Sequence, residues 1–129
     1  TQIGKVLKHA TDEAKKQKVG ALVFVGDAFE EDIDRVCHRA GELGLSGVPA
    51  FMFQEGGNPI AASAFKQIAK LTGGAYCPFD EASAGQLAEL LRAVAVFAAG
   101  GQHALADFSK GKGGEVRKLA AALKALPGQ

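Results

Sequence analysis

The stretch Ala21-Leu-Val-Phe-Val-Gly-Asp-Ala-Phe-Glu-Glu31 decides how the rest of the chain is interpreted. It opens with an unbroken apolar run, which is typical of a strand buried on both faces of a parallel sheet. Asp27 follows at the carboxyl end of this predicted strand, where open α/β sheets bind their ligands. The same carboxylate could instead serve only as the N-cap of the following helix. From this stretch alone both interpretations stay open.

The composition excludes several classes of function. The chain has 129 residues, of which 47% are hydrophobic, and this suits one domain with a real core. Its net charge of +1 gives no bias toward nucleic acid or an anionic membrane. No apolar run approaches the roughly 20 residues of a membrane span. Cys37 and Cys77 form no Cys-x-x-Cys pair or zinc set. The lack of a disulfide framework predicts a cytoplasmic protein.

Helical and strand patterns alternate along the chain. Helices are predicted over residues 2–17, 30–43, 59–72 and 84–99, and strands over 21–26, 48–53 and 75–79. This alternation predicts an α/β fold, with a Rossmann-like open parallel sheet sandwiched by helices and right-handed crossovers. The side chains that we expect to be nearly fully buried are Leu22, Phe24, Ile33, Phe51, Phe53, Ile68 and Leu90.

The last part of the chain has a different character. Gly100-Gly101 predicts a break, after which a short helix over 102–108, a basic linker over 109–114 and a final helix over 115–126 are expected. We therefore divide the chain into a domain over residues 1–99 and a helical extension over 100–129. The extension is either a linker with a docking helix or a helix packed back over apolar surface, and we favour the second.

Three predicted strand ends meet at one rim of the sheet, and they carry Gly26-Asp27, Gln54-Glu55 and Phe79-Asp80. Thr1 occupies the N-cap position of the helix that leads into the first strand, so we place it at the same rim. A hydroxyl and carboxylates are hard oxygen ligands of the kind that magnesium and manganese prefer. The rim is therefore the candidate ligand site.

Several segments, in the same order, resemble the later part of a von Willebrand factor A domain. The chain from Thr1 to Ala10 resembles the segment that follows the family's metal-site threonine, and residues 21–27 resemble the fourth strand with its metal-site aspartate. Residues 48–53 resemble the fifth strand. Phe65 to Tyr76, with its Thr-Gly-Gly run, is similar to the segment before the sixth strand, and Gln86 to Leu91 resembles the final helix.

The resemblance covers residues 1–99 and implies a metal-ion-dependent adhesion site in which Thr1 and Asp27 are ligands. The family's Asp-x-Ser-x-Ser loop would lie before Thr1, so the domain is expected to be truncated at its N-terminus. The usual Thr-Asp-Gly run is here Gly26-Asp27-Ala28. The resemblance thus implies a Mg²⁺ or Mn²⁺ ion, held at a site that is incomplete in these residues, and no catalysis.

The expected partner is a protein, whose carboxylate would complete the metal site. Because the family's first strand pairs with the fourth, strand 21–26 is expected to have an open edge. A second copy of the chain, or the missing N-terminal part, could pair there. Nucleic acid and membrane are not expected as partners.

Three other functions remain open at this stage. Asp27 could be the phosphoacceptor of an Asp-based phosphotransfer domain, or the chain could be a hydrolase. The first needs further carboxylates for magnesium and a lysine at a later strand end, and the second lacks a Gly-x-Ser-x-Gly elbow. The chain could also be a structural piece that only supports assembly.

Overall fold

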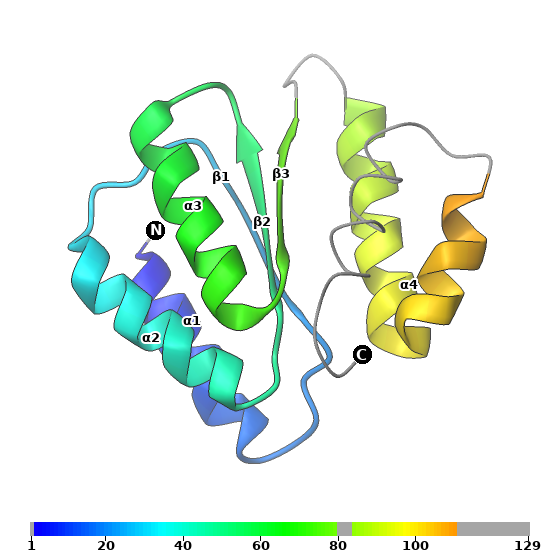
Figure 1. Ribbon diagram of the computed structural model, residues 1–129, viewed down its shortest axis with the longest axis horizontal. Helices are drawn as coiled ribbons and strands as arrows, with labels where there is room; N and C mark the ends of the chain where they lie inside the picture. Colours follow the sequence, from blue (N-terminus) through cyan, green and yellow to red (C-terminus); the bar gives the residue numbers. More distant parts are fainter. Residues whose placement is uncertain (1, 80–83, 111–129) are drawn as a thin grey trace.

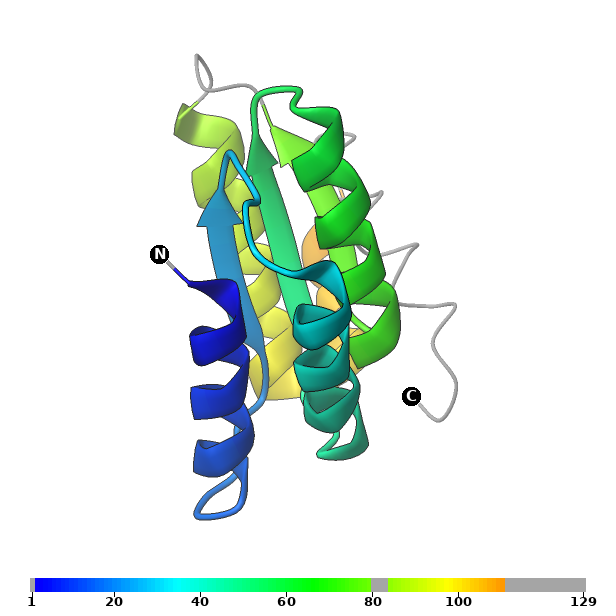
Figure 2. The same ribbon diagram turned by 90° about the vertical axis from the view of Figure 1, so that its left-hand side faces the viewer.

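The computed structural model describes residues 2–79 and 84–110. Along the chain the elements are α1 (Ile3–Ala14), β1 (Leu22–Gly26), α2 (Ile33–Leu45), β2 (Ala50–Glu55), α3 (Pro59–Thr72), β3 (Ala75–Phe79) and α4 (Ala84–Ser109). The strands form an open parallel sheet in the order β1-β2-β3. Figures 1 and 2 show α1, α2 and α3 on one face of this sheet and α4 on the other. The predicted Rossmann-like α/β architecture is confirmed.

The central strand of the described sheet is β2. It pairs with β1 on one side and β3 on the other, so that Phe51 lies between Val23 and Ala75. Its side chains alternate between two buried clusters, with Met52 under α1, α2 and α3 and with Phe51 and Phe53 under α4. Residues 50–54 are all buried, whereas β1 and β3 are buried only in part.

The expectation that β1 is equally buried is wrong. Leu22 and Phe24 are only half-buried, and Val25 is 41% exposed. Among the described strands β1 pairs with β2 alone, so no described strand covers its other edge. Ile33 was also predicted to be nearly fully buried and is only half-buried, because it opens α2 at the edge of the core. The remaining predicted core residues are confirmed, each at 0% exposure: Phe51, Phe53, Ile68 and Leu90.

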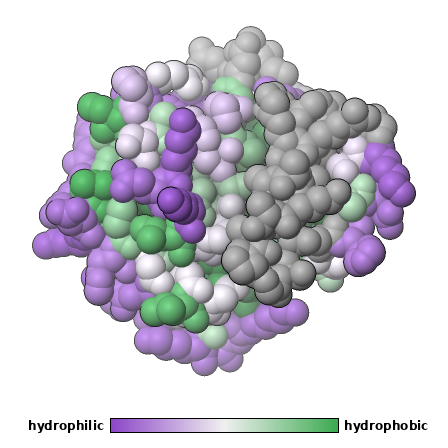
Figure 3. Space-filling view, viewed as in Figure 1, coloured by the Kyte–Doolittle hydropathy of each residue, from purple (hydrophilic) through white to green (hydrophobic). Residues whose placement is uncertain are grey.

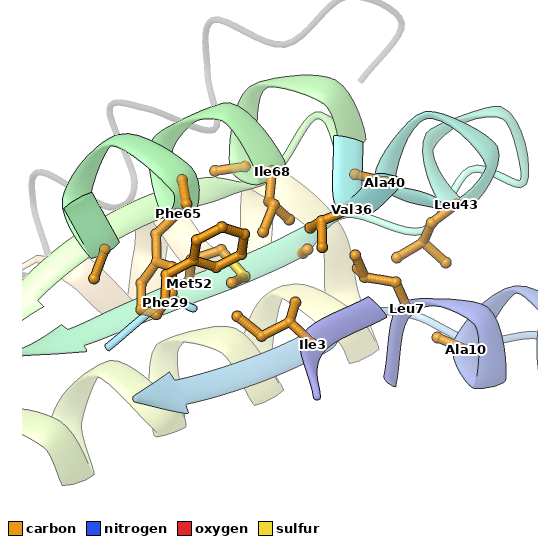
Figure 4. Close-up of a cluster of buried hydrophobic side chains, with 14 of the residues drawn as sticks. Ile3, Leu7, Ala10, Phe29, Val36, Ala40, Leu43, Met52, Phe65 and Ile68 are labelled. Carbon is orange, nitrogen blue, oxygen red and sulfur yellow. The ribbon is translucent and has the colours of Figure 1, made fainter. Parts of the chain in front are cut away.

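The core beneath α1, α2 and α3 fixes these helices against the sheet. Figure 4 shows Leu7 of α1, Val36 of α2 and Ile68 of α3 pointing into one cluster that also contains Met52. At the end of α2, a Cβ added to Gly44 would lie 2.3 Å from the carbonyl oxygen of Leu71. Gly44 is therefore required for the close approach of α2 and α3. The helix predicted over 30–43 does not end before Gly44, because α2 continues to Leu45.

The predicted ends of α3 are confirmed. The Asn58 side chain accepts hydrogen bonds from the backbone N–H groups of Ile60 (2.9 Å) and Ala61 (3.0 Å). Pro59 occupies the first helical position, and Gly73 closes the helix with φ of 76°. This short-range chemistry fixes the segment between β2 and β3.

The last described helix bends at the predicted break. Gly101 is non-helical within α4, with φ of 75° and ψ of −163°. Beyond it Leu105 is 1% exposed, and it belongs to the cluster that contains Phe51. The helix predicted over 115–126 lies outside the described residues, so the division at residue 99 stays a prediction.

The surface seen in Figure 3 is mixed, with separate hydrophobic side chains among hydrophilic ones. Ile60 and Leu71 of α3 are exposed hydrophobic residues, at 66% and 45%. Within residues 2–79 and 84–110, no helix combines the length and the apolar character needed to cross a bilayer.

Candidate functional site

The carboxyl ends of the parallel strands lie along one edge of the sheet, as the rim interpretation requires. Gly26 is in register with Gln54, and Gln54 with Pro78. Asp27 follows directly after β1, and its side chain is exposed. It does not cap α2, because Asp32 is the N-cap and accepts a hydrogen bond from the Asp34 N–H at 3.0 Å. The alternative interpretation, that Asp27 is only the N-cap of the following helix, is therefore wrong.

A cleft of about 580 Å³ lies at this end of β1, and we call it the β1 cleft. Its lining consists of Gln2 and the continuous segment 24–31. The carboxylate-bearing residues Asp27, Glu30 and Glu31 thus lie beside the start of α1. The predicted N-cap, Thr1, is wrong, because Gln2 is the N-cap residue of α1 and lines this cleft. Thr1 itself lies outside the described residues, so its place at the rim stays a prediction.

Glu31 has a role that the sequence analysis missed. Its carboxylate accepts hydrogen bonds from the backbone N–H groups of Ile3 (2.6 Å) and Gly4 (2.9 Å). These are donors that an α-helix leaves unsatisfied at its N-terminus, where a negative charge also suits the helix dipole. Gln2, the N-cap residue of α1, makes no side-chain cap hydrogen bond. Glu31 therefore caps α1 from a distant part of the chain.

This finding corrects the helix predicted over 30–43, whose first turn would have contained Glu30, Glu31 and Asp32. That helix begins at Ile33, and Asp34 is the acidic residue in its first turn. Acidic residues at 30–32 are equally compatible with the first turn of the next helix. The local pattern therefore gave no sign that Glu31 caps α1 instead.

The second strand end is structural in character. Gln54 is fully buried, and the Tyr76 hydroxyl donates to its Oε1 at 2.6 Å. The Gln54 amide Nε2 donates to the carbonyl oxygen of Asn58 at 2.9 Å. Burial raises the pKa of the Tyr76 hydroxyl, which keeps it protonated as a donor. Gln54 and Glu55 do not line the β1 cleft, so the predicted convergence of strand ends is only partial.

Metal ions in proteins are commonly held by groups of His, Cys, Asp or Glu side chains. Among the described residues, no group of three or more of these side chains is arranged to hold an ion. Of the predicted ligands, Asp27 is exposed at the cleft, and Thr1 lies outside the described part. Asp80, at the third strand end, also lies outside it.

Comparisons with family models, with curated proteins and with solved structures find no match to this chain. The resemblance to von Willebrand factor A domains therefore stays a prediction from the sequence.

Proposed function

We propose that this protein is a non-enzymatic protein-binding module of the von Willebrand factor A type, and that the β1 cleft is its recognition surface. One observation carries the proposal. Three acidic residues near α1 and α2 have different roles, because Glu31 and Asp32 each accept hydrogen bonds from helix N-terminal amides. Asp27 is exposed and makes no hydrogen bond or ion pair with another described residue. Of the acidic residues that line the cleft, Asp27 and Glu30 therefore remain available to a partner, and Asp27 is the one that directly follows β1.

A divalent cation, Mg²⁺ or Mn²⁺, is part of this proposal. Asp27 would be one ligand and Thr1 a second, and a partner's carboxylate would supply another. Such hard cations take six or more oxygen ligands and retain water when the protein supplies few. We therefore expect the ion to bind weakly to this chain alone and more tightly when the partner is present.

The enzyme alternatives gain no support from the described residues. A phosphotransfer site would require a lysine near Asp27. No lysine is among the described residues that line the β1 cleft. His9 and His38 are exposed on helices, with side chains 77% and 76% accessible. We expect no covalent product when the protein is incubated with acetyl phosphate. A phosphoaspartate at Asp27, detected by mass spectrometry, would overturn the non-enzymatic assignment.

The open edge of β1 belongs to the same proposal. Its outer backbone groups face no described strand, and edges of this kind pair readily with another strand. We propose that a strand from a second copy, or from a preceding part of a longer protein, pairs there. Light scattering after size exclusion tests self-association. A stable monomer whose β1 amides are protected from exchange would contradict pairing at this edge.

We also propose the cytoplasm as the compartment. Cys37 and Cys77 are both free thiols, which suits a reducing environment.

The binding proposal can be tested by site-specific photo-crosslinking in cells of the source organism. A photoreactive residue replaces Ala28, which lines the β1 cleft, or Ser46, an exposed control position after α2. We expect a discrete protein adduct from position 28 only. The adduct should decrease after chelation of divalent cations and in the Asp27→Asn variant. Equal adducts from both positions, or an adduct insensitive to Asp27→Asn, would contradict the proposed surface.

A further inference from the structure

A second hollow lies between α1 and α2, which run side by side on the same face of the sheet (Figures 1 and 2). Its volume is about 320 Å³. Val36 is buried at 1% exposure, and a Cβ added to Gly4 would lie 3.9 Å from its Cγ2 atom. The close approach of the two helices at Gly4 and Val36 thus forms the base of the hollow. We call this hollow the basic groove, because four basic residues line it: Lys5, Lys8, Arg35 and Arg39.

The acidic side chains in this groove offset only part of its positive charge. Glu31 and Asp32 also line the groove. However, the Glu31 carboxylate accepts the N–H groups at the start of α1, and Asp32 accepts an N–H at the start of α2. These hydrogen bonds hold both carboxylates in place without removing their charges, so the lining has four positive charges against two negative ones.

Most of the cations in the groove lack a carboxylate. Lys8 is paired with Asp12, at 2.8 Å between Nζ and Oδ2. Lys5, Arg35 and Arg39 make no ion pair with any other described residue. The groove is thus a concentration of unpaired positive charge in a chain whose net charge is only +1.

The cations form two levels along the groove. Lys5 and Lys8 are three residues apart on α1, and Arg35 and Arg39 are four apart on α2, so each pair spans roughly 4.5–6 Å along its helix. The contact of Gly4 with Val36 sets the two helices in register. Lys5 and Arg35 therefore form one level and Lys8 and Arg39 the next.

This spacing selects among anionic ligands. In an extended peptide, side chains at alternate positions lie on the same face roughly 6.6 Å apart. Two such acidic side chains match the two levels, and each arginine can hold a carboxylate with two parallel hydrogen bonds. A single small anion could engage only one level.

We propose that the basic groove binds an extended acidic segment of a partner protein, with carboxylates at alternate positions. The inference rests on the proposed function, because it assumes that the domain binds a protein. It names a second contact surface and the chemistry of the partner that fits it. Neither Asp27 nor a cation takes part in this contact.

The test is a titration with a fluorescein-labelled eight-residue peptide that carries glutamates at alternate positions. A peptide of the same composition with its glutamates adjacent serves as the comparison. Binding is followed by fluorescence anisotropy in EDTA. We expect saturable binding that is tighter for the alternating peptide. Arg35→Gln with Arg39→Gln should weaken it by about tenfold or more, the size expected when hydrogen bonds between charged groups are lost.

Lys18→Gln with Lys70→Gln is the matched control, because it removes the same charge from exposed positions outside the groove. It should change affinity by less than about twofold, since distant exposed charges are screened by salt. Thermal melts followed by circular dichroism confirm that both double variants are folded. Arg39→Lys should lose less affinity than Arg39→Gln.

Three results would overturn the inference. These are no saturable binding of the alternating peptide, equal weakening by the control variant, or equal affinity for both peptides with full competition by inorganic phosphate. The last result would assign the groove to a small anion. Binding of the alternating peptide should be unchanged in Asp27→Asn. Failure of the β1 cleft proposal and failure of the groove proposal are therefore distinguished.

Discussion

Replacement of Glu31 tests whether the segment after β1 holds the start of α1. The Glu31 carboxylate receives two backbone N–H groups of α1, at 2.6 and 2.9 Å, from residues that are 28 and 27 positions away in the sequence. Glu31→Ala removes both acceptors and the negative charge. The N–H groups of Ile3 and Gly4 would then depend on water.

The magnitude can be worked out from these contacts. Loss of a helix-capping side chain costs about 0.5–2 kcal/mol, and a hydrogen bond to a charged group contributes about 1.5–3 kcal/mol. Glu31 is half-buried, so water would replace part of what is lost. We expect Glu31→Ala to lower the free energy of unfolding by about 2 kcal/mol. Glu31→Gln keeps an acceptor oxygen and should cost about half as much.

Urea denaturation measures this free energy, and amide exchange at Ile3 and Gly4 localises the effect. Glu30→Ala is the control, because Glu30 is exposed and has no hydrogen bond to a described residue. Its effect should be within about 0.5 kcal/mol. Equal effects of Glu31→Ala and Glu30→Ala, or unchanged exchange at Ile3 and Gly4, would refute this role for Glu31.

Two further predictions concern the core and the exposed face of α1. Phe51→Ala should lower the free energy of unfolding by about 3–5 kcal/mol in denaturant melts, because Phe51 is fully buried. Phe24→Ala should lower it by less, because Phe24 is half-buried. The reverse order would mean that β1 is the central strand. The hydrogen bond from Lys8 holds the pKa of Asp12 below its ordinary value of 3.8. The interaction therefore stabilises the fold at pH values above 3.8, and this stabilisation is lost as the pH falls through the lower pKa of the folded state. Lys8→Met should raise the Asp12 midpoint in a carboxyl NMR titration, and an unchanged midpoint would contradict the interaction.

The elements that could be predicted from the sequence are those with local causes. Asn58-Pro59 and Gly73 carry their own capping chemistry, so both ends of α3 were predicted correctly. The Gly100-Gly101 break is equally a consequence of backbone preferences. The alternation of helices and strands was enough to predict the parallel sheet.

The features that were missed depend on tertiary neighbours. The apolar runs of β1 and β2 look alike in the sequence, and only the pairing order shows that β2 is covered on both sides. The capping of α1 by Glu31 joins segments far apart in the chain. The basic groove has a local signal in Arg35 and Arg39, one turn apart on α2. It needs the packing of α1 against α2 before it becomes a surface.

Manganese titration of the ¹⁵N-labelled protein tests the central claim, that the β1 cleft around Asp27 is a cation-assisted recognition surface. Paramagnetic broadening detects weak binding, which is what a site with few ligands in this chain should show. We predict that the amides of residues 26–28 and of the start of α1 broaden first, and that Asp27→Asn abolishes this while Asp34→Asn does not. Broadening centred on other acidic residues, or unaffected by Asp27→Asn, would contradict the account.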